Sequence, residues 1–272
     1  MTSQFFQKYG YSLILLKELV RTEFKLRYQG SVLGYLWSLM RPLFLFVIMY
    51  VVFVFFLKVG KDVDQWPIQL LLGIVLWNFF AEVTNNGVTA IVNRGDVIRK
   101  INFPKYVIVL ASSISALINL FINLVVILVF MFISKVDLQW EMFLAPLFII
   151  ELFVFALGLA FLLSSLFVKL RDTNYIWEII MQGLFYASIV IYPITMILQH
   201  GDFYAKLLLL NPIAQTIQDA RHSLISSDAH TLFSLTDGNI LYAAIPVAIA
   251  VVTFMIGALV FKKSSPSFAE NV

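Results

Sequence analysis

Long apolar segments alternate with short polar ones along most of the chain. A helix needs about 20 apolar residues to cross the hydrocarbon core of a bilayer, and six segments are long enough. They are Gly34–Leu57, Ile68–Val92, Val107–Ile133, Met142–Val168, Ile176–Leu198 and Ile240–Phe261. The sequence therefore predicts an all-α integral membrane protein with six transmembrane helices, contained in residues 34–262.

An amphipathic helix is predicted ahead of the first span, within the N-terminal segment 1–33. Between residues 13 and 28, apolar side chains recur every three or four positions, whereas Lys17, Arg21 and Lys25 fall on the opposite face. Such a helix lies in the membrane interface, in contact with lipid, with its cations toward the headgroups. Gly30 and Gly34 then permit a turn into the first span. A simple membrane anchor has the same pattern.

Composition supports the membrane assignment and removes several functional classes. The 272 residues are 61% hydrophobic and 13% charged, with a mean hydropathy of +0.90, whereas soluble domains are about 25% charged. The net charge is only +3 and the basic residues flank apolar spans, which indicates membrane topology and not nucleic-acid binding. Because cysteine is absent, disulfides, thiol nucleophiles and cysteine metal sites are excluded.

The positions of the 19 Lys and Arg residues predict the orientation of the spans. Six spans place both termini on one side, and the opposite side then carries only Lys58, Lys61, Lys135, Lys206 and Arg221. Cytoplasmic loops are enriched in Lys and Arg. We therefore expect both termini, including the tail 263–272, to be cytoplasmic.

Three passages, in order along the chain, resemble one family of transporters. RYQGSVLGYLWSLMRPL (27–43) follows the amphipathic helix, NRGDVIRKINFPK (93–105) follows the second span, and LNPIAQTIQDAR (210–221) follows the fifth. Together with the number of spans, they resemble the membrane subunits of ABC exporters for lipid-linked polysaccharides. This is the Wzm/TagG group, which exports O-antigen or teichoic acid.

The resemblance implies that residues 93–105 form a cytoplasmic coupling helix, which fits a groove on an ATP-binding subunit. The interface helix would contact the same subunit, and the short loop 169–175 would add a second contact. The expected coupling residues are Arg21, Lys25, Arg94, Arg99, Lys100, Phe103, Pro104, Arg171 and Asp172. Taken alone, an ordinary solvated cytoplasmic loop has a similar basic composition.

The energy source is expected on another polypeptide, because the chain contains no Gly-x-x-x-x-Gly-Lys-Ser/Thr phosphate loop. The resemblance implies two copies of each subunit in the cytoplasmic (inner) membrane of a bacterium, with the conduit at the permease homodimer interface. ATP and Mg²⁺ would bind to the partner, and we expect no cofactor or metal in this chain. The substrate would be an undecaprenyl-linked or similar lipid-linked glycan, from O-antigen, teichoic acid or capsule.

Residues 199–239 are too apolar for a free loop and too short to span a bilayer. Irregular backbone at membrane depth is tolerated only where protein or a water-filled cavity covers it. We predict two short re-entrant helices that dip in from the external face and turn at Asn211-Pro212. As an external gate they would use Asn211, Pro212, Ile213 and Ile217. A helix lying flat on the outer surface is the alternative.

A path for sugars needs aromatic surfaces and few fixed charges. The candidates are aromatic residues of the first and fifth spans and one acid at membrane depth: Trp37, Phe44, Trp177, Phe185, Tyr192 and Glu82. Packing explains such stripes equally well in a chain with 26 Phe and 11 Tyr. Glu82 is also suited to an interhelical hydrogen bond, and Asn119 and Asn123 are expected to hold helices together.

Two other functional classes remain open at this point. A proton-coupled transporter would use the acids at membrane depth, Glu82, Glu151 and Glu178, although such proteins usually have internal repeats and none is visible. Glu178 is instead expected to pair with Arg171. A membrane enzyme acting on lipid-linked glycans would need clustered acids, bases or metal ligands. His200, His222 and His230 are spaced unlike a zinc site.

Overall fold

The computed structural model of the chain describes residues 2–27, 33–34, 36–101, 103–137 and 139–271. These residues form helices, turns and loops without strands, which confirms the predicted all-α class. The helices are α1 (Thr2–Arg27), α2 (Leu36–Met49) with its π-helical continuation η1 (Tyr50–Phe56), α3 (Trp66–Thr89), α4 (Gly95–Lys100), α5 (Tyr106–Ile133), α6 (Ala145–Lys169), α7 (Thr173–Ala187), α8 (Ile194–Leu198), α9 (Asp202–Leu209), α10 (Pro212–Leu224), α11 (Leu232–Leu235), α12 (Ile240–Ser264) and α13 (Phe268–Asn271), with 3-10 turns at Val92–Arg94, Trp140–Leu144 and Ser265–Ser267.

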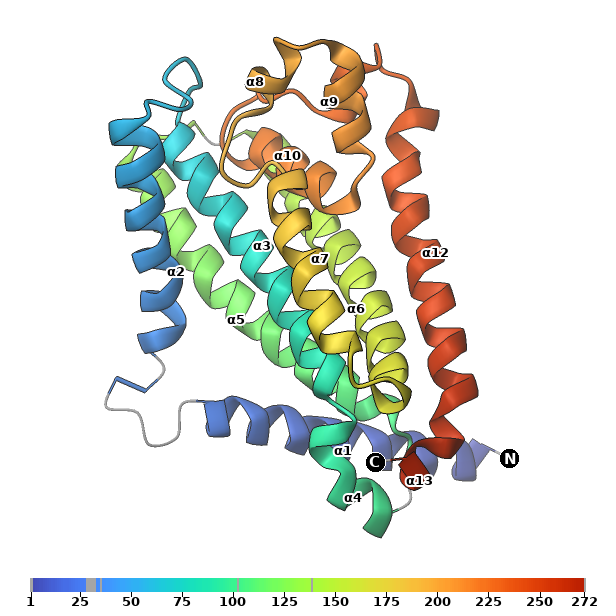
Figure 1. Ribbon diagram of the computed structural model, residues 1–272. Coiled ribbons are helices and arrows are strands. Elements are labelled where there is room, and N and C mark those ends of the chain that lie inside the picture. Colours follow the sequence, from blue (N-terminus) through green and yellow to red (C-terminus); the bar gives the residue numbers. More distant parts are fainter. Residues whose placement is uncertain (1, 28–32, 35, 102, 138, 272) are drawn as a thin grey trace.

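Five helical segments in the described part of the chain are long and apolar enough to cross a membrane: α2 with η1, α3, α5, α6 and α12. The central one is α3, which packs against α2, α5, α6 and α7 (Figure 1). Of its apolar stretch 78% is buried, against 6% for α2 at the edge of the bundle. Because α3 is covered on most sides by protein, its apolar residues form the core and not a lipid-facing surface.

The predicted fifth span, residues 176–198, is not a continuous helix. α7 ends at Ala187, and irregular backbone separates it from α8. Within this segment Ile189 has φ of +55°, a left-handed conformation that is unfavourable for a β-branched residue. Pro193 has no N–H with which to continue a helix. The predicted fifth span is therefore interrupted after α7, and the expected number of six spans is not confirmed.

A buried guanidinium explains why the chain unwinds there. Arg221 of α10 is fully buried, and it donates to the backbone oxygens of Ile189 and Val190, at 2.9 Å each. It also donates to the backbone oxygen of Gln69 in α3 at 3.1 Å, and its Cζ lies 5.1 Å from the ring centroid of Trp66. A buried charge needs hydrogen-bond partners, and a regular helix would keep those carbonyls for its own bonds.

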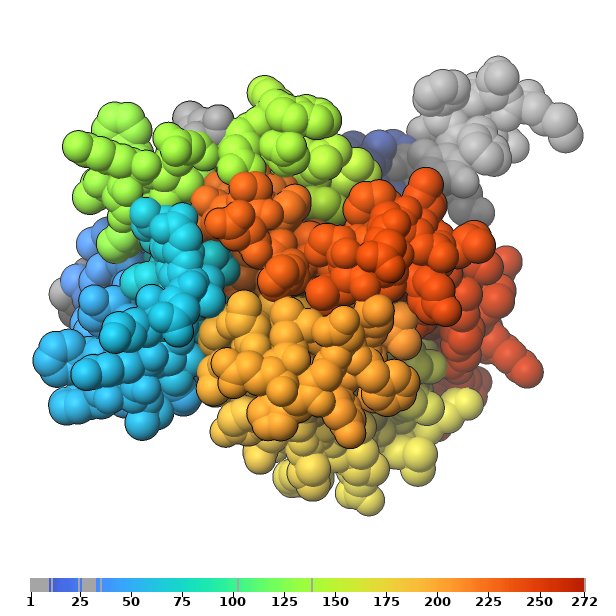
Figure 2. All heavy atoms as spheres, turned by 90° about the horizontal axis from the view of Figure 1, so that it is seen from above, coloured from blue at the N-terminus to red at the C-terminus, as the bar shows by residue number. Residues whose placement is uncertain are grey.

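α9 and α10 meet at the predicted turn, Asn211-Pro212. The Oδ1 of Asn211 accepts from the backbone N–H of Ile213 at 3.1 Å, and its Nδ2 donates to Ser188 Oγ at 3.1 Å. One side chain thus caps α10 and ties it to the end of α7. Pro212, Ile213 and Ile217 are buried, because α10 packs against α3 and α6. Figure 2 looks onto this end of the bundle, which the segments around α8 to α11 cover.

Both termini lie at the opposite end, where α1 runs across the bundle and packs against α5 (Figure 1). α1 is longer than predicted and begins at Thr2. Gly34 has φ of +49° before α2, in agreement with the expected turn, whereas Gly30 lies outside the described residues. The tail is not free: Phe268 is fully buried, with its ring centroid 5.2 Å from that of Phe261.

α6 and α12 cross closely through two glycines. A Cβ atom on Gly257 would overlap the backbone oxygen of Gly158, and one on Gly158 would lie 2.5 Å from the Cα of Phe254. Small residues of this kind let helix backbones approach within a membrane. The sequence pattern did not reveal this pair, because the two positions belong to different spans.

We expect Gly257→Ala to destabilise the fold by about 1–3 kcal/mol, because an inserted methyl group must push the two backbones apart. Thermal unfolding of the purified chain in detergent measures the change. Gly183→Ala is the matched control, since a Cβ there meets nothing within 4 Å. Equal melting temperatures for the two variants would contradict the close crossing.

We expect Arg221→Lys to loosen residues 188–193, because an ammonium group cannot reach three carbonyls as the guanidinium fork does. Hydrogen bonds to charged groups are worth about 1.5–3 kcal/mol each, so the melting temperature should also fall. Hydrogen exchange of residues 188–193 is the specific readout. Arg171→Lys, an exposed position, serves as the control, and unchanged exchange in Arg221→Lys would refute the role assigned to the guanidinium.

Candidate functional site

A polar pocket of about 690 Å³ lies between α2, α3 and α5, and we call it the α2/α3/α5 pocket. Its polar lining consists mainly of one cation, one acid and five carboxamides: Arg41, Glu82, Asn78, Asn85, Asn86, Asn119 and Asn123. Four of them belong to α3: Asn78 and, four, seven and eight positions later, Glu82, Asn85 and Asn86. This spacing places them on one face of the helix. Polar side chains at membrane depth are costly and usually functional, which makes this pocket the candidate site.

One hydrogen bond joins two walls of the pocket. The Nδ2 of Asn119 in α5 donates to Glu82 Oε2 in α3 at 2.9 Å, and Asn123 Nδ2 donates to the backbone oxygen of Asn119 at 2.8 Å. The interhelical role expected for Glu82 and Asn119 is thereby confirmed. The Oδ1 of Asn119 is buried and accepts no hydrogen bond from the residues that the structure describes. Asn119 lines the pocket, but this oxygen itself has almost no exposed surface.

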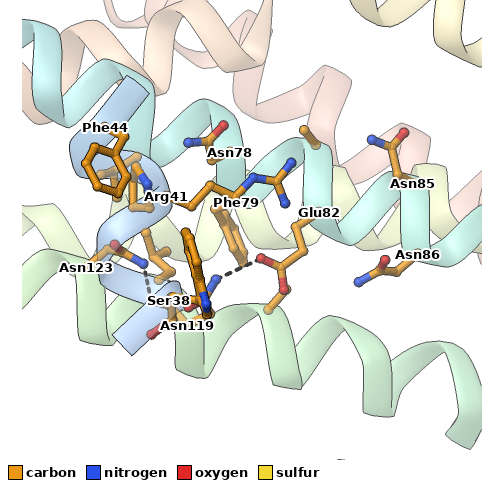
Figure 3. Close-up of a pocket in the computed structure, with 16 residues that line it drawn as sticks. Ser38, Arg41, Phe44, Asn78, Phe79, Glu82, Asn85, Asn86, Asn119 and Asn123 are labelled. Atoms are coloured by element: carbon orange, nitrogen blue, oxygen red, sulfur yellow. Dashed lines mark hydrogen bonds between the residues drawn. The ribbon is translucent and has the colours of Figure 1, made fainter. Parts of the chain in front are cut away.

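The third wall, α2, supplies aromatic surface and a cation. Trp37 and Phe44 line the pocket and are 44% and 56% exposed. Figure 3 shows the guanidinium of Arg41 extended from α2 toward α3, on the side of Glu82. Ser38, one turn before Pro42, is buried. Three residues expected along the conduit, Trp37, Phe44 and Glu82, are therefore brought together here.

The conduit candidates in α7 and just after it lie elsewhere. Trp177 is only 5% exposed, and its ring centroid lies 6.4 Å from that of Phe80. The ring of Phe185 meets Trp77 edge-on at 5.3 Å between centroids, and the hydroxyl of Tyr192 donates to a backbone oxygen in α7. These side chains pack within the single chain and do not line the α2/α3/α5 pocket.

The expected coupling elements come together at the end that carries the termini. α4 is a six-residue helix, shorter than the expected 93–105 element. Arg94, just before it, pairs with Glu23 of α1 at 3.4 Å, so the two expected contact elements are joined. Sequence reasoning missed this pair because the partners are 71 positions apart. Arg99 and Lys100 are exposed in the last turn of α4, where the helix dipole favours cations.

The remaining coupling candidates differ in exposure. Arg21, Lys25, Arg171 and Asp172 are exposed, whereas Phe103 is buried and Pro104 half-buried. Phe103 and Pro104 therefore anchor the loop before α5.

Glu178 does not pair with Arg171 as expected. Its Oε1 accepts from Asn174 Nδ2 at 2.7 Å, and the Cζ of Arg171 lies over the ring of Phe167 at 5.2 Å from the centroid. The asparagine is the nearer partner because it lies one helical turn before Glu178 on α7.

A second buried polar cluster links α10 to α6. The Oδ2 of Asp219 accepts from Gln215 Nε2 one turn earlier in α10. Glu151 of α6 lies near both side chains, but its buried Oε1 has no hydrogen-bond partner among the described residues. Burial raises the pKa of Asp219 from 3.8 to about 6, against the opposing effects of the Gln215 hydrogen bond and nearby His222. Glu151 was identified from the sequence as a membrane acid, but its neighbours come from a segment 64 or more positions away and left no local signal.

Comparison with known proteins identifies relatives along nearly the whole chain. Residues 14–225 match the model of the family described as ABC-2 type transporter. The chain is 28% identical to the O-antigen export system permease protein RfbA of Myxococcus xanthus over 263 residues, which is 95% of each protein. Two proteins of the same name from Klebsiella pneumoniae are 27% and 26% identical, over 96% of each chain.

We expect Asp219→Asn to stabilise the protein at pH 8. The raised pKa means that folding favours the protonated carboxyl, so wild-type stability falls as the pH rises from about 4 through about 6. The variant should lose the part of this decline that comes from Asp219 and gain up to about 3 kcal/mol at pH 8. Melting temperatures between pH 4 and 8 measure the effect. Asp228→Asn, an exposed site, should keep the wild-type profile; an Asp219→Asn profile like that of the wild type would contradict the assignment.

Proposed function

Because the chain belongs to the ABC-2 type transporter family, we propose that it is the permease subunit of an ATP-driven exporter of a lipid-linked polysaccharide. The observation that carries this proposal is its likeness, over nearly the full length, to proteins named as O-antigen export permeases. Those names favour an O-antigen-type glycan over teichoic acid or capsule. The polar pocket at membrane depth supports a hydrophilic cargo.

A separate ATPase subunit, with bound ATP and Mg²⁺, would drive transport. The printed sequence contains no phosphate loop, which supports such a partner. Its docking face would be the exposed cations of α1 and α4, which the Glu23–Arg94 pair holds together. With that face in the cytoplasm, both termini are cytoplasmic and α9 and α10 lie on the external side of the inner membrane, as the Lys and Arg distribution favours.

A second copy of the chain would complete the conduit. Apolar side chains are exposed along η1 and α7, including Val51, Phe55, Ile179 and Tyr186. Lipid covers such faces in a single chain, and a partner subunit covers them equally well. In a homodimer with two ATPase copies, the α2/α3/α5 pocket, with Trp37 and Phe44 on its wall, would open onto the path between subunits, and the turn at Asn211 would close the external end of that path.

We expect Arg99→Glu with Lys100→Glu to abolish export while the protein still inserts in the membrane. Two reversed charges at the end of α4 would repel the partner surface that binds these cations. The measurements are the amount of co-purified ATPase, by mass spectrometry after mild detergent extraction, and the amount of glycan at the cell surface. Both should fall at least tenfold.

The matched control reverses two exposed lysines at the other end of the bundle, Lys61→Glu with Lys135→Glu, and should behave like the wild type. Normal export by the α4 variant would refute the docking face. If the wild-type chain purifies without any protein that contains a phosphate loop, the exporter proposal itself is wrong.

A further inference from the structure

The formal charges lining the α2/α3/α5 pocket cancel. Arg41 contributes one positive charge and Glu82 one negative charge, and the remaining polar side chains are mostly carboxamides. A phosphate or diphosphate is usually recognised by clustered cations or backbone amides, and a hard cation by clustered carboxylates. Carboxamides both donate and accept hydrogen bonds. A lining of this kind matches an uncharged ligand that also does both.

The unsatisfied oxygen of Asn119 indicates which chemical group the ligand should carry. Its amide nitrogen is already used by Glu82, so the side chain cannot turn over without breaking that bond. Its buried Oδ1 has no donor among the described residues, and an ionised phosphate has no proton to donate. A hydroxyl group does have one. The side chain lines the pocket but this oxygen has almost no exposed surface, so a ligand hydroxyl reaches it only by displacing a neighbouring side chain.

Shape and aromatic surface agree with this chemistry. The volume of about 690 Å³ falls within the range of about 300–1,000 Å³ typical of small-molecule sites. Trp37 and Phe44 are partly exposed on the α2 wall, where they can cover an apolar ring face. A sugar ring combines apolar C–H faces with hydroxyls around its edge, and thus matches both kinds of wall.

We infer that the α2/α3/α5 pocket is a binding site for an uncharged sugar unit at membrane depth within a single copy of the chain. The inference rests on the proposed function, because it assigns the sugar to the exported glycan. Asn119 Oδ1 accepts from a sugar hydroxyl, while Asn85 on the α3 wall hydrogen-bonds the ring edge and Trp37 covers one ring face. The site is separate from the aromatic residues of α7.

The test uses the full chain in lipid nanodiscs, free of alkyl-glycoside detergents that would compete. The probes are methyl α-mannoside, methyl β-galactoside and N-acetylglucosamine, with glucuronate and inorganic pyrophosphate as charged comparators. Saturation-transfer NMR titrations give the dissociation constants. At least one neutral sugar should bind saturably, and more tightly than either charged compound.

Variants locate the binding. Asn119→Leu should weaken it at least tenfold by removing the free acceptor. Since that change also releases Glu82, Asn85→Leu provides a second pocket variant at a side chain that makes no hydrogen bond to the described residues. Asn174→Leu, which removes an exposed carboxamide outside the pocket, should bind like the wild type.

Three outcomes would overturn the inference: no saturable binding of any neutral sugar, tighter binding of pyrophosphate or glucuronate, or full binding by both pocket variants. The first would mean that the pocket holds water, and the second an anionic headgroup. Failure here is distinguishable from failure of the proposed function. If any of these three outcomes is found for a chain that co-purifies with an ATPase and exports glycan, only the sugar site is refuted.

Discussion

The arrangement of the half of the molecule away from the termini depends on one buried cation. Arg221 brings a full charge among apolar helices, and the chain must surround it with acceptors. It receives them from the start of α3 and from the unwound segment after α7. Gly73 leaves the space, since a Cβ there would lie 2.7 Å from the guanidinium Nη2. α10 is consequently held inside the bundle, and the predicted fifth span is interrupted at the end of α7.

Two buried polar clusters of the bundle differ in how they are packed. Asp219, Gln215 and Glu151 are packed between α10 and α6, where protein replaces solvent around them. The α2/α3/α5 pocket keeps space instead, and its carboxamides are only partly used by other side chains. Gln215 and Asp219 share a hydrogen bond, but one oxygen of Gln215 and one of Glu151 are buried without a partner among the described residues, so close packing and not complete pairing distinguishes this cluster. The open α2/α3/α5 pocket leaves polar side chains without hydrogen-bond partners within the described part of the chain, which is unfavourable unless water or a polar ligand occupies it.

Apolar length predicted α3, α5, α6 and α12 to within a few residues, because a bilayer imposes length directly. The interruption of the fifth span could not be predicted from its apolar residues. The cause is Arg221, 31 positions after Val190, whose side chain takes the backbone oxygen of Val190 as a hydrogen-bond acceptor. Spacing on α3 and α5 suggested that Glu82 and Asn119 join helices. Nothing local indicated that Trp177 packs inside the chain, since aromatic stripes of core and conduit look alike.

The connectivity of the α2/α3/α5 pocket has a thermodynamic consequence. Two of its walls, α3 and α5, are joined in sequence through α4, whereas α2 stands at the edge of the bundle (Figure 1). A displacement of α4 is therefore transmitted to two walls and changes their separation from the third. Linkage is reciprocal: if the position of α4 alters the affinity of the pocket, then occupancy alters the position of α4 by the same free energy. Binding of a ligand in the pocket would therefore shift the position of α4, at the end of the bundle that carries the termini.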